Sequence, residues 1–146
     1  MDKTTVDLKN DSTVKDKTRD FGKKGEKKIL VVDDTPINLK IVDVLLKKLG
    51  YCADLIDNGR DALEMMKKIN YDVVFLDHLM PDLDGVDTLK RAREINRHYQ
   101  DAVFVAMTGN ISPTTRDEYL CYGFTDYIEK PIIPDKLEEL LYTYME

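Results

Sequence analysis

Carboxylates stand directly after two apolar runs of this 146-residue chain. The run ILVV (29–32) is followed by Asp33 and Asp34, and the run VFL (74–76) is followed by Asp77. Three carboxylates that lie close together repel one another and resist removal from water. Mg²⁺ relieves both costs, because it takes oxygen ligands and is commonly held by one or two carboxylates together with phosphate oxygens. If the three aspartates meet, they predict a Mg²⁺ site, with Mn²⁺ as the alternative ion.

Two further polar residues stand at the ends of apolar runs. Thr108 follows AVFVAM (102–107), and Lys130 ends DYIEK (126–130). A lysine and a hydroxyl beside a metal-binding carboxylate suit phosphoryl transfer, in which catalysis is mostly positioning and charge neutralisation. An aspartate can itself be the nucleophile and form an aspartyl phosphate. The sequence has no glycine-rich loop of the Walker or dinucleotide-binding type, so a bound nucleotide is not expected.

The elements that would position these residues can be predicted from apolar spacing. Five short apolar runs are expected to be strands: 28–32, 52–56, 72–76, 102–107 and 126–130. Two of them, 29–32 and 73–76, are continuous rather than alternating, which is typical of strands covered on both faces. Between the runs lie five segments with helical spacing. In the first helix the predicted inward stripe is Ile37, Ile41, Val44, Leu45 and Leu49.

Five strands that alternate with five helices predict an α/β fold around a parallel sheet. In such folds, ligands bind outside the carboxyl ends of the strands. Asp33, Asp34, Asp77, Thr108 and Lys130 are therefore expected to meet at one edge of the sheet.

Composition and charge differ along the chain. Residues 1–27 are polar and lack periodicity, which predicts a flexible tail or linker; residues 28–146 are predicted to form one domain. Residues 29–146 hold 22 acidic and 13 basic side chains, so a nucleic-acid partner is not expected. Cys52 and Cys121 have neither metal-site nor disulfide spacing and are expected to be reduced thiols. With neither a secretory signal nor a membrane span visible, we expect a cytoplasmic location and no direct membrane contact.

Four motifs in register resemble the receiver domain of bacterial two-component response regulators. They are VVDD (31–34), LDHLMPDLDG (76–85), AMTGN (106–110) and DYIEKP (126–131), and the resemblance covers residues 28–146. It implies a flavodoxin-like (βα)5 fold, with a five-stranded parallel sheet of order 2-1-3-4-5 and helices on both faces. It also implies that the domain is not an enzyme beyond its own phosphoryl transfer and slow autodephosphorylation.

The resemblance implies a role for each residue of the acidic cluster. Asp77 would accept a phosphoryl group from a phosphohistidine of a histidine kinase or a histidine phosphotransfer domain. Asp34 and Asp77 would bind Mg²⁺ through their side chains, Leu79 through its backbone carbonyl, and Asp33 through water. The apolar side chain of Leu79 would overhang the phosphorylation site without helping to orient water.

The resemblance also implies a switch. Lys130 and Thr108 would bind phosphoryl oxygens. The peptide bond between Lys130 and Pro131 would be cis. Tyr127 would move inward when Thr108 moves. The surface formed by the fourth helix, the fifth strand and the fifth helix would then change shape, and a homodimer could form through it.

A finer resemblance concerns the parent protein. Residues 33–51, DDTPINLKIVDVLLKKLGY, look like receivers that are fused to hybrid sensor histidine kinases. Such receivers commonly pass phosphate to a histidine phosphotransfer domain within a phosphorelay, and the parent protein could be a membrane-anchored histidine kinase. A stand-alone single-domain response regulator is the alternative.

Other readings of the same residues stay open at this point. Asp34 or Thr35 could be a simple helix N-cap. A phosphohydrolase with an aspartyl nucleophile is a minor alternative, although it needs a second aspartate where this chain has Leu79. A receiver that folds but is never phosphorylated is another. His78 is expected to be a rim residue that tunes access to the acceptor, and His98 to lie on a loop surface.

Overall fold

The computed structural model describes residues 27–109 and 111–145. The predicted flexible tail therefore lies, except for Lys27, outside the described residues, and the domain boundary at residue 28 stays a prediction.

The core of the fold is a parallel sheet of five strands. They are β1 (Ile29–Val32), β2 (Ala53–Ile56), β3 (Val73–Asp77), β4 (Val103–Thr108) and β5 (Asp126–Glu129). Their order is β2-β1-β3-β4-β5, and every neighbouring pair is parallel. The predicted strand order of 2-1-3-4-5 is confirmed.

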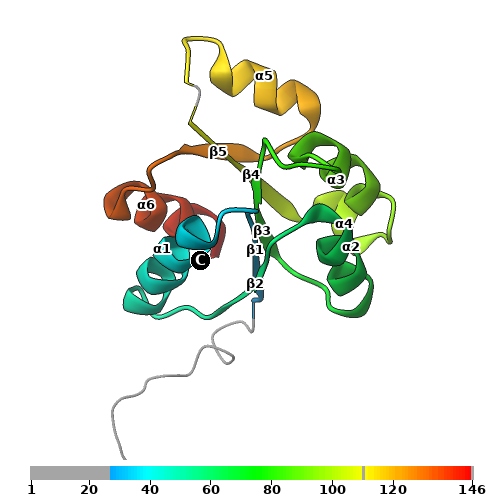
Figure 1. Ribbon diagram of the computed structural model, residues 1–146, viewed down its shortest axis with the longest axis horizontal. Coiled ribbons are helices and arrows are strands. Elements are labelled where there is room, and N and C mark those ends of the chain that lie inside the picture. The colour runs from blue at the N-terminus through cyan, green and yellow to red at the C-terminus, as the bar shows by residue number, and fades with distance from the viewer. Residues whose placement is uncertain (1–26, 110, 146) are drawn as a thin grey trace, which may run out of the picture.

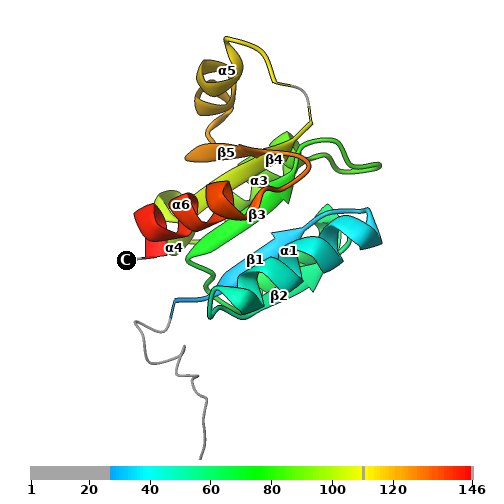
Figure 2. The same ribbon diagram turned by 90° about the vertical axis from the view of Figure 1, so that its left-hand side faces the viewer.

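Helices cover both faces of this sheet. They are α1 (Pro36–Lys48), α2 (Gly59–Lys68), α3 (Gly85–Arg93), α4 (His98–Asp101), α5 (Thr115–Tyr122) and α6 (Pro134–Met145). In Figure 1, α1 and α6 lie on one side of the sheet, and α2, α3 and α4 lie on the other. Figure 2 shows α1 and α6 in front of the strands, and α5 beyond the β5 edge.

The two faces of the sheet carry separate hydrophobic cores. Because successive strand residues point to opposite faces, Ile29 and Val31 join the core under α1 and α6, whereas Leu30 and Val32 join the core under α2 and α3. All four side chains are buried. This explains why the run is continuously apolar: neither face of β1 meets water.

The predicted inward stripe of α1 is wrong at three positions. Ile37, Ile41 and Val44 are 65%, 40% and 40% exposed, whereas Val42 and Leu46 are buried. The helix carries apolar side chains on more than one face, so spacing alone does not choose the face that docks. Packing against the sheet and α6 determines which face is buried. Of the predicted stripe, only Leu45 and Leu49 are partly buried against the core.

The prediction of five helices misses α4, and the reading of His98 as loop surface is wrong. His98 begins α4 and is partly buried, and its Nε2 lies 2.6 Å from the backbone oxygen of Tyr71. A single helical turn is too short to show apolar periodicity, so no sequence pattern predicts α4.

Several helix ends follow their sequence signals. Asn58 and Asp84 accept hydrogen bonds from the backbone N–H groups of Asp61 and Asp87, which caps α2 and α3. Gly123 ends α5 with a φ of 109°, in the left-handed region that favours glycine.

Among the described residues, none of the helices has the length and apolar character needed to cross a membrane. Cys52 and Cys121 are both exposed free cysteines.

Candidate functional site

The three aspartates predicted to form a metal site do lie together. Strands β1 and β3 are parallel neighbours, so their carboxyl ends reach the same edge of the sheet. There, one carboxylate oxygen from each of Asp33, Asp34 and Asp77 lies within 4.8 Å of the others. Asp33 and Asp77 are buried, at 0% and 4% exposure, whereas Asp34 is partly exposed at the mouth of the cluster.

Lys130 reaches this cluster from the end of β5. Its Nζ lies 2.8 Å from Oδ1 of Asp77 and 3.2 Å from Oδ2 of Asp33. Its backbone N–H donates to the carbonyl of Thr108 over 2.8 Å, so the ends of β4 and β5 are joined beside the site. The peptide bond between Lys130 and Pro131 is cis, as the resemblance implies.

Burial and neighbouring charges shift the pKa values of Asp77 and Lys130, the two partners of the central ion pair. Burial raises the pKa of Asp77 to about 6; the hydrogen bond from Lys130 lowers it, and the negative charge of Asp33 raises it further. For Lys130, burial alone would lower the pKa, but Asp77 and Asp33 more than offset this, so the pKa lies above its usual value. The cluster therefore holds more negative charge than its lysine neutralises.

The donor set fits a hard divalent cation. Three carboxylates face one ammonium group, and Oδ2 of Asp33 is fully buried with no hydrogen-bond partner among the described residues, apart from its ion pair with Lys130. Its other oxygen accepts from the backbone N–H of Thr35 over 2.9 Å, which orients the carboxylate. Oxygen ligands with unmatched negative charge are what Mg²⁺ binds in proteins.

The helix-capping alternative is not supported. Thr35 occupies the N-cap of α1, but no side-chain hydrogen bond caps this helix, and Asp34 lies one residue before the cap position. The carboxylate of Asp34 instead belongs to the acidic cluster.

Thr108 and Leu79 line the same cavity as the cluster. This cavity of about 510 Å³ also includes Asp34, Asp77 and Lys130. Thr108 ends β4 and is 4% exposed, whereas the side chain of Leu79 is 73% exposed at the rim. The predicted roles of these residues toward a metal or a phosphoryl group stay predictions.

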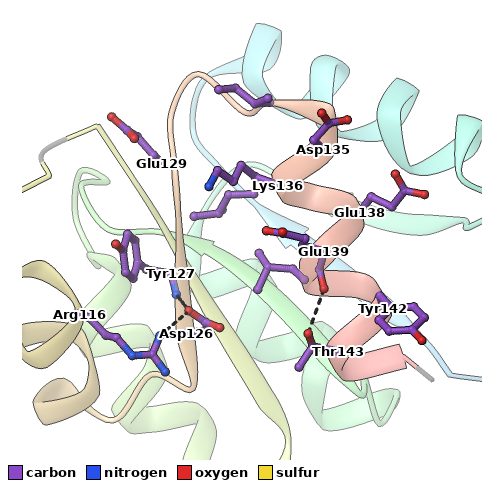
Figure 3. A pocket seen from close by; sticks show the side chains of 13 residues that line it. Arg116, Asp126, Tyr127, Glu129, Asp135, Lys136, Glu138, Glu139, Tyr142 and Thr143 are labelled. Atoms are coloured by element: carbon purple, nitrogen blue, oxygen red, sulfur yellow. Dashed lines mark hydrogen bonds and ion pairs between the residues drawn. The ribbon is translucent and has the colours of Figure 1, made fainter.

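Tyr127 lies elsewhere. It lines a different cavity, of about 870 Å³, between β5 and α6 (Figure 3). The ring of Tyr127 stacks on the ring of Tyr119, with centroids 6.2 Å apart and planes 22° apart. The predicted switch tyrosine therefore does not line the acidic cavity, but its ring contacts Tyr119, which does.

Tyr119 is the site residue that the sequence reading missed. It projects from α5, is 4% exposed, and lines the acidic cavity. Its hydroxyl lies 2.7 Å from Nδ1 of His78, and the two rings meet edge to face at 5.3 Å. His78 lines the cavity, as expected of a rim residue, and its contacts with Tyr119 hold its ring there. The available signal in the sequence was the spacing of Thr115 and Tyr119, which lie four positions apart and so share one face of a helix. In the structure these are the two buried residues of α5.

Gly85, at the start of α3, is predicted to tolerate no side chain. A Cβ atom there would lie 2.4 Å from the carbonyl oxygen of Asp77 and 3.0 Å from the Cα of His78. Backbone atoms cannot yield without moving the end of β3. We therefore expect Gly85→Ala to lower the free energy of unfolding by about 1–3 kcal/mol in urea titrations. Gly109→Ala is the matched control, because its Cβ would meet nothing within 4 Å. Equal stability of the two variants would contradict this packing.

Comparison with known proteins agrees with the site. The family model described as the response regulator receiver domain matches residues 29–142. The hybrid signal transduction histidine kinase F of Dictyostelium discoideum is 36% identical over 130 residues, which cover 87% of this chain and 12% of that protein. The histidine-protein kinase BarA of Escherichia coli K12 is 32% identical over 116 residues, covering 80% of this chain and 12% of that protein. The chain thus spans only about an eighth of these relatives.

Solved structures show the same likeness. The chemotaxis response regulator CheY4 of Vibrio cholerae is 29% identical with a TM-score of 0.74, covering 81% of this chain and 98% of that one. The receiver domain of the sensor histidine kinase PA1611 from Pseudomonas aeruginosa PAO1 is 28% identical with a TM-score of 0.72, covering 82% of this chain and 97% of that one. With the fold, the acidic cluster and the matched family model in agreement, this chain belongs to the response regulator receiver domain family of two-component signalling.

Proposed function

We propose that Asp77 accepts a phosphoryl group from a phosphohistidine. The observation that carries this proposal is the meeting of three carboxylates and Lys130 at one edge of the sheet. A carboxylate oxygen of Asp77 attacks the phosphorus, and the phosphorus–oxygen bond forms as the phosphorus–nitrogen bond breaks. The phosphohistidine ring, protonated on its other nitrogen, takes the electron pair of the broken bond and leaves as neutral imidazole. With a pKa of about 6, Asp77 is mostly ionised at neutral pH and can act as the nucleophile.

The metal ligands that we propose are the side chains of Asp34 and Asp77 and the backbone carbonyl of Leu79, with Asp33 bound through water. When bound, Mg²⁺, or Mn²⁺ as the alternative, shields the charge between the carboxylates and the phosphoryl oxygens. The structure of the PA1611 receiver, described as having a magnesium ion coordinated in its active-site cleft, supports this proposal. Lys130, which forms an ion pair with the acceptor carboxylate, would pair with a phosphoryl oxygen.

The donor of the phosphoryl group would be a histidine kinase or a histidine phosphotransfer domain. One curated relative is a hybrid histidine kinase and another is a histidine-protein kinase, and this chain matches about an eighth of each, so a hybrid kinase in a phosphorelay is the parent protein that we propose. A stand-alone regulator stays the alternative, because this chain covers nearly all of CheY4. In either setting the domain would act in the cytoplasm.

The output surface that we propose is formed by α5, β5 and α6, which correspond to the predicted fourth helix, fifth strand and fifth helix. Figure 3 shows the hollow between β5 and α6 at the centre of this surface. The residues that line it include five acidic side chains, Asp126, Glu129, Asp135, Glu138 and Glu139, and two basic ones, Arg116 and Lys136. A homodimer through this surface would have to pair these basic residues with the acidic ones of the second copy.

The proposal can be tested by incubating the chain with acetyl phosphate and Mg²⁺ and measuring its intact mass. We expect the mass to rise by one phosphoryl group, and we expect no rise in the presence of a chelator or in Asp77→Asn. Asp82→Asn is the control, because Asp82 is an exposed residue of the same loop and pairs with Arg60. Phosphate on Asp77→Asn would contradict the assignment, and rapid turnover of many small phosphate esters would favour a phosphohydrolase instead.

Thr108→Ala is expected to keep phosphorylation but to weaken the response to it. The phosphoryl group would lose one hydrogen bond, and a net contribution of about 1 kcal/mol changes a conformational equilibrium roughly fivefold. The backbone amide NMR signals of β5 should therefore shift less on phosphorylation than they do in the wild type. Full-sized shifts in the phosphorylated variant would show that Thr108 does not carry the response.

A further inference from the structure

Aromatic rings form one wall of the acidic cavity. Tyr119 and Tyr122 reach this cavity from α5, and His78 reaches it from the position after Asp77. The rings of Tyr119 and Tyr122 meet edge to face, with centroids 5.8 Å apart. The centroid of the His78 ring lies 5.3 Å from that of Tyr119 and 6.0 Å from that of Tyr122. These three rings, which we call the aromatic wall, therefore form one cluster beside the proposed phosphoryl acceptor.

The members of the aromatic wall differ in exposure. Tyr119 is 4% exposed, and its hydroxyl lies 2.7 Å from Nδ1 of His78, so it forms the fixed base of the wall. The side chain of Tyr122 is 42% exposed. Because Tyr122 also lines the cavity, its ring is the part of the wall that a ligand entering from solvent meets.

Charge at the opening of the cavity favours a cationic ligand. Among the described residues that line the cavity, Asp34, Asp77 and Glu118 are acidic and Lys130 is basic. The ammonium group of Lys130 lies 2.8 Å from Asp77, so its charge is already paired. Glu118 is exposed and lies four positions before Tyr122 on α5, which places both side chains on one face of the helix. The opening thus combines a carboxylate with aromatic rings, whose negative faces attract cations.

The donor in the proposed reaction carries a group that fits this opening. A phosphohistidine protonated on its second nitrogen has a flat ring with a positive charge. In phosphoryl transfer the attacking and leaving atoms lie roughly in line with the phosphorus, so the leaving nitrogen faces away from Asp77. Asp77 is buried, whereas Leu79, Glu118 and Tyr122 of the same cavity are exposed. The leaving ring therefore lies among the exposed residues at the opening.

Resting on the proposed function, we propose that Tyr122 binds the imidazole ring of the phosphohistidine donor, on a wall held in place by Tyr119 and His78. Glu118 adds negative charge at the same opening. As the phosphorus–oxygen bond to Asp77 forms and the phosphorus–nitrogen bond breaks, the ring takes the electron pair and leaves as neutral imidazole. The ring loses its positive charge in this step, so its attraction to Tyr122 weakens and the product is released. The aromatic wall thus selects donors whose leaving group is a ring.

Two small donors test this selection, with Mg²⁺ present and at one pH. Phosphoimidazole and phosphoramidate both transfer their phosphoryl group by breaking a phosphorus–nitrogen bond, but only phosphoimidazole carries a ring. The readout is the rate constant for the rise in intact mass with each donor. A cation–π contact at an exposed site corresponds to roughly a two- to fivefold change in a rate constant. We expect Tyr122→Leu to slow phosphorylation by phosphoimidazole by about that factor and to leave phosphorylation by phosphoramidate unchanged.

Two further variants control for other causes. Tyr122→Phe keeps the ring and should keep the wild-type ratio of the two rate constants. Tyr142→Leu removes a tyrosine that is 73% exposed on α6 and lines the other cavity, so it should change neither rate constant. The same fall in the ratio for Tyr122→Phe or for Tyr142→Leu would overturn the proposal, because the cause would then be the hydroxyl or a general effect.

The remaining outcomes separate this proposal from the proposed function. If Tyr122→Leu does not fold, Tyr122→Met fills a similar space without a ring, and the same fall in the ratio is expected. An unchanged ratio, or equal slowing with both donors, would overturn the role of Tyr122 and leave Asp77 as the acceptor. A wild type that takes phosphate from neither donor would overturn both.

Discussion

Asp77→Asn is expected to be more stable than the wild type at neutral pH in the absence of divalent cations, by about 2–3 kcal/mol. The pKa of Asp77 is raised from 3.8 to about 6, mainly by burial. A carboxyl group whose pKa is raised on folding binds its proton more tightly in the folded state. Its ionisation therefore costs stability as the pH rises from about 4 to about 6, and the whole cost is present above that window. Asparagine has the same shape and no charge, so it avoids this cost.

The measurement is urea unfolding in a chelator at several pH values. The difference in stability between Asp77→Asn and the wild type should grow between about pH 4 and pH 6 and then level off. Asp82→Asn should show no such gain, because Arg60 holds the pKa of Asp82 below its usual value. Added Mg²⁺ should stabilise the wild type much more than Asp77→Asn. A wild type that is more stable than Asp77→Asn throughout would contradict this account.

Lys130→Met is expected to have the opposite effect. The ammonium group of Lys130 lies 2.8 Å from Asp77 and 3.2 Å from Asp33, and the carboxylate of Asp33 is completely buried. Removing one partner of a buried ion pair leaves an uncompensated charge. Because the Lys130 side chain is 22% exposed, we expect a loss of about 2–3 kcal/mol, somewhat less than for a fully buried pair.

Adding divalent cations distinguishes a loss of stability caused by unbalanced charge from one caused by disturbed core packing. Without Lys130 the three carboxylates have no competing cation, so Mg²⁺ should bind more tightly than in the wild type and should recover much of the lost stability. Lys136→Met is the control, since Lys136 is exposed on α6 and forms no ion pair with the described residues. If Mg²⁺ does not rescue Lys130→Met, the variant has disturbed packing rather than charge.

The two variants have opposite effects because the site is unbalanced in charge. One lysine faces three carboxylates, and two of these lie out of water. Stability would favour fewer acidic groups, whereas metal binding and phosphoryl transfer need them. Local conflict of this kind is expected at functional sites.

The sequence by itself was sufficient to predict the acidic site. Asp33, Asp34 and Asp77 follow apolar runs that read as buried parallel strands, and Thr108 and Lys130 end two more. The carboxyl ends of parallel strands share one edge of a sheet, so these residues could be placed together without coordinates. Strand order and the cis peptide bond at Lys130 followed from the motifs through the resemblance to receiver domains.

Only the tertiary structure decided which face of each helix packs against the sheet and which side chains from the helices reach the site. The apolar positions of α1 fit more than one inward face, and packing against the sheet and α6 buried Val42 and Leu46 rather than Ile37 and Ile41. The contact between His78 and Tyr119 joins residues 41 positions apart. Such contacts depend on how each helix is rotated and tilted on the sheet. Local spacing records which residues share a face, but the surfaces that pack against a helix determine where that face points.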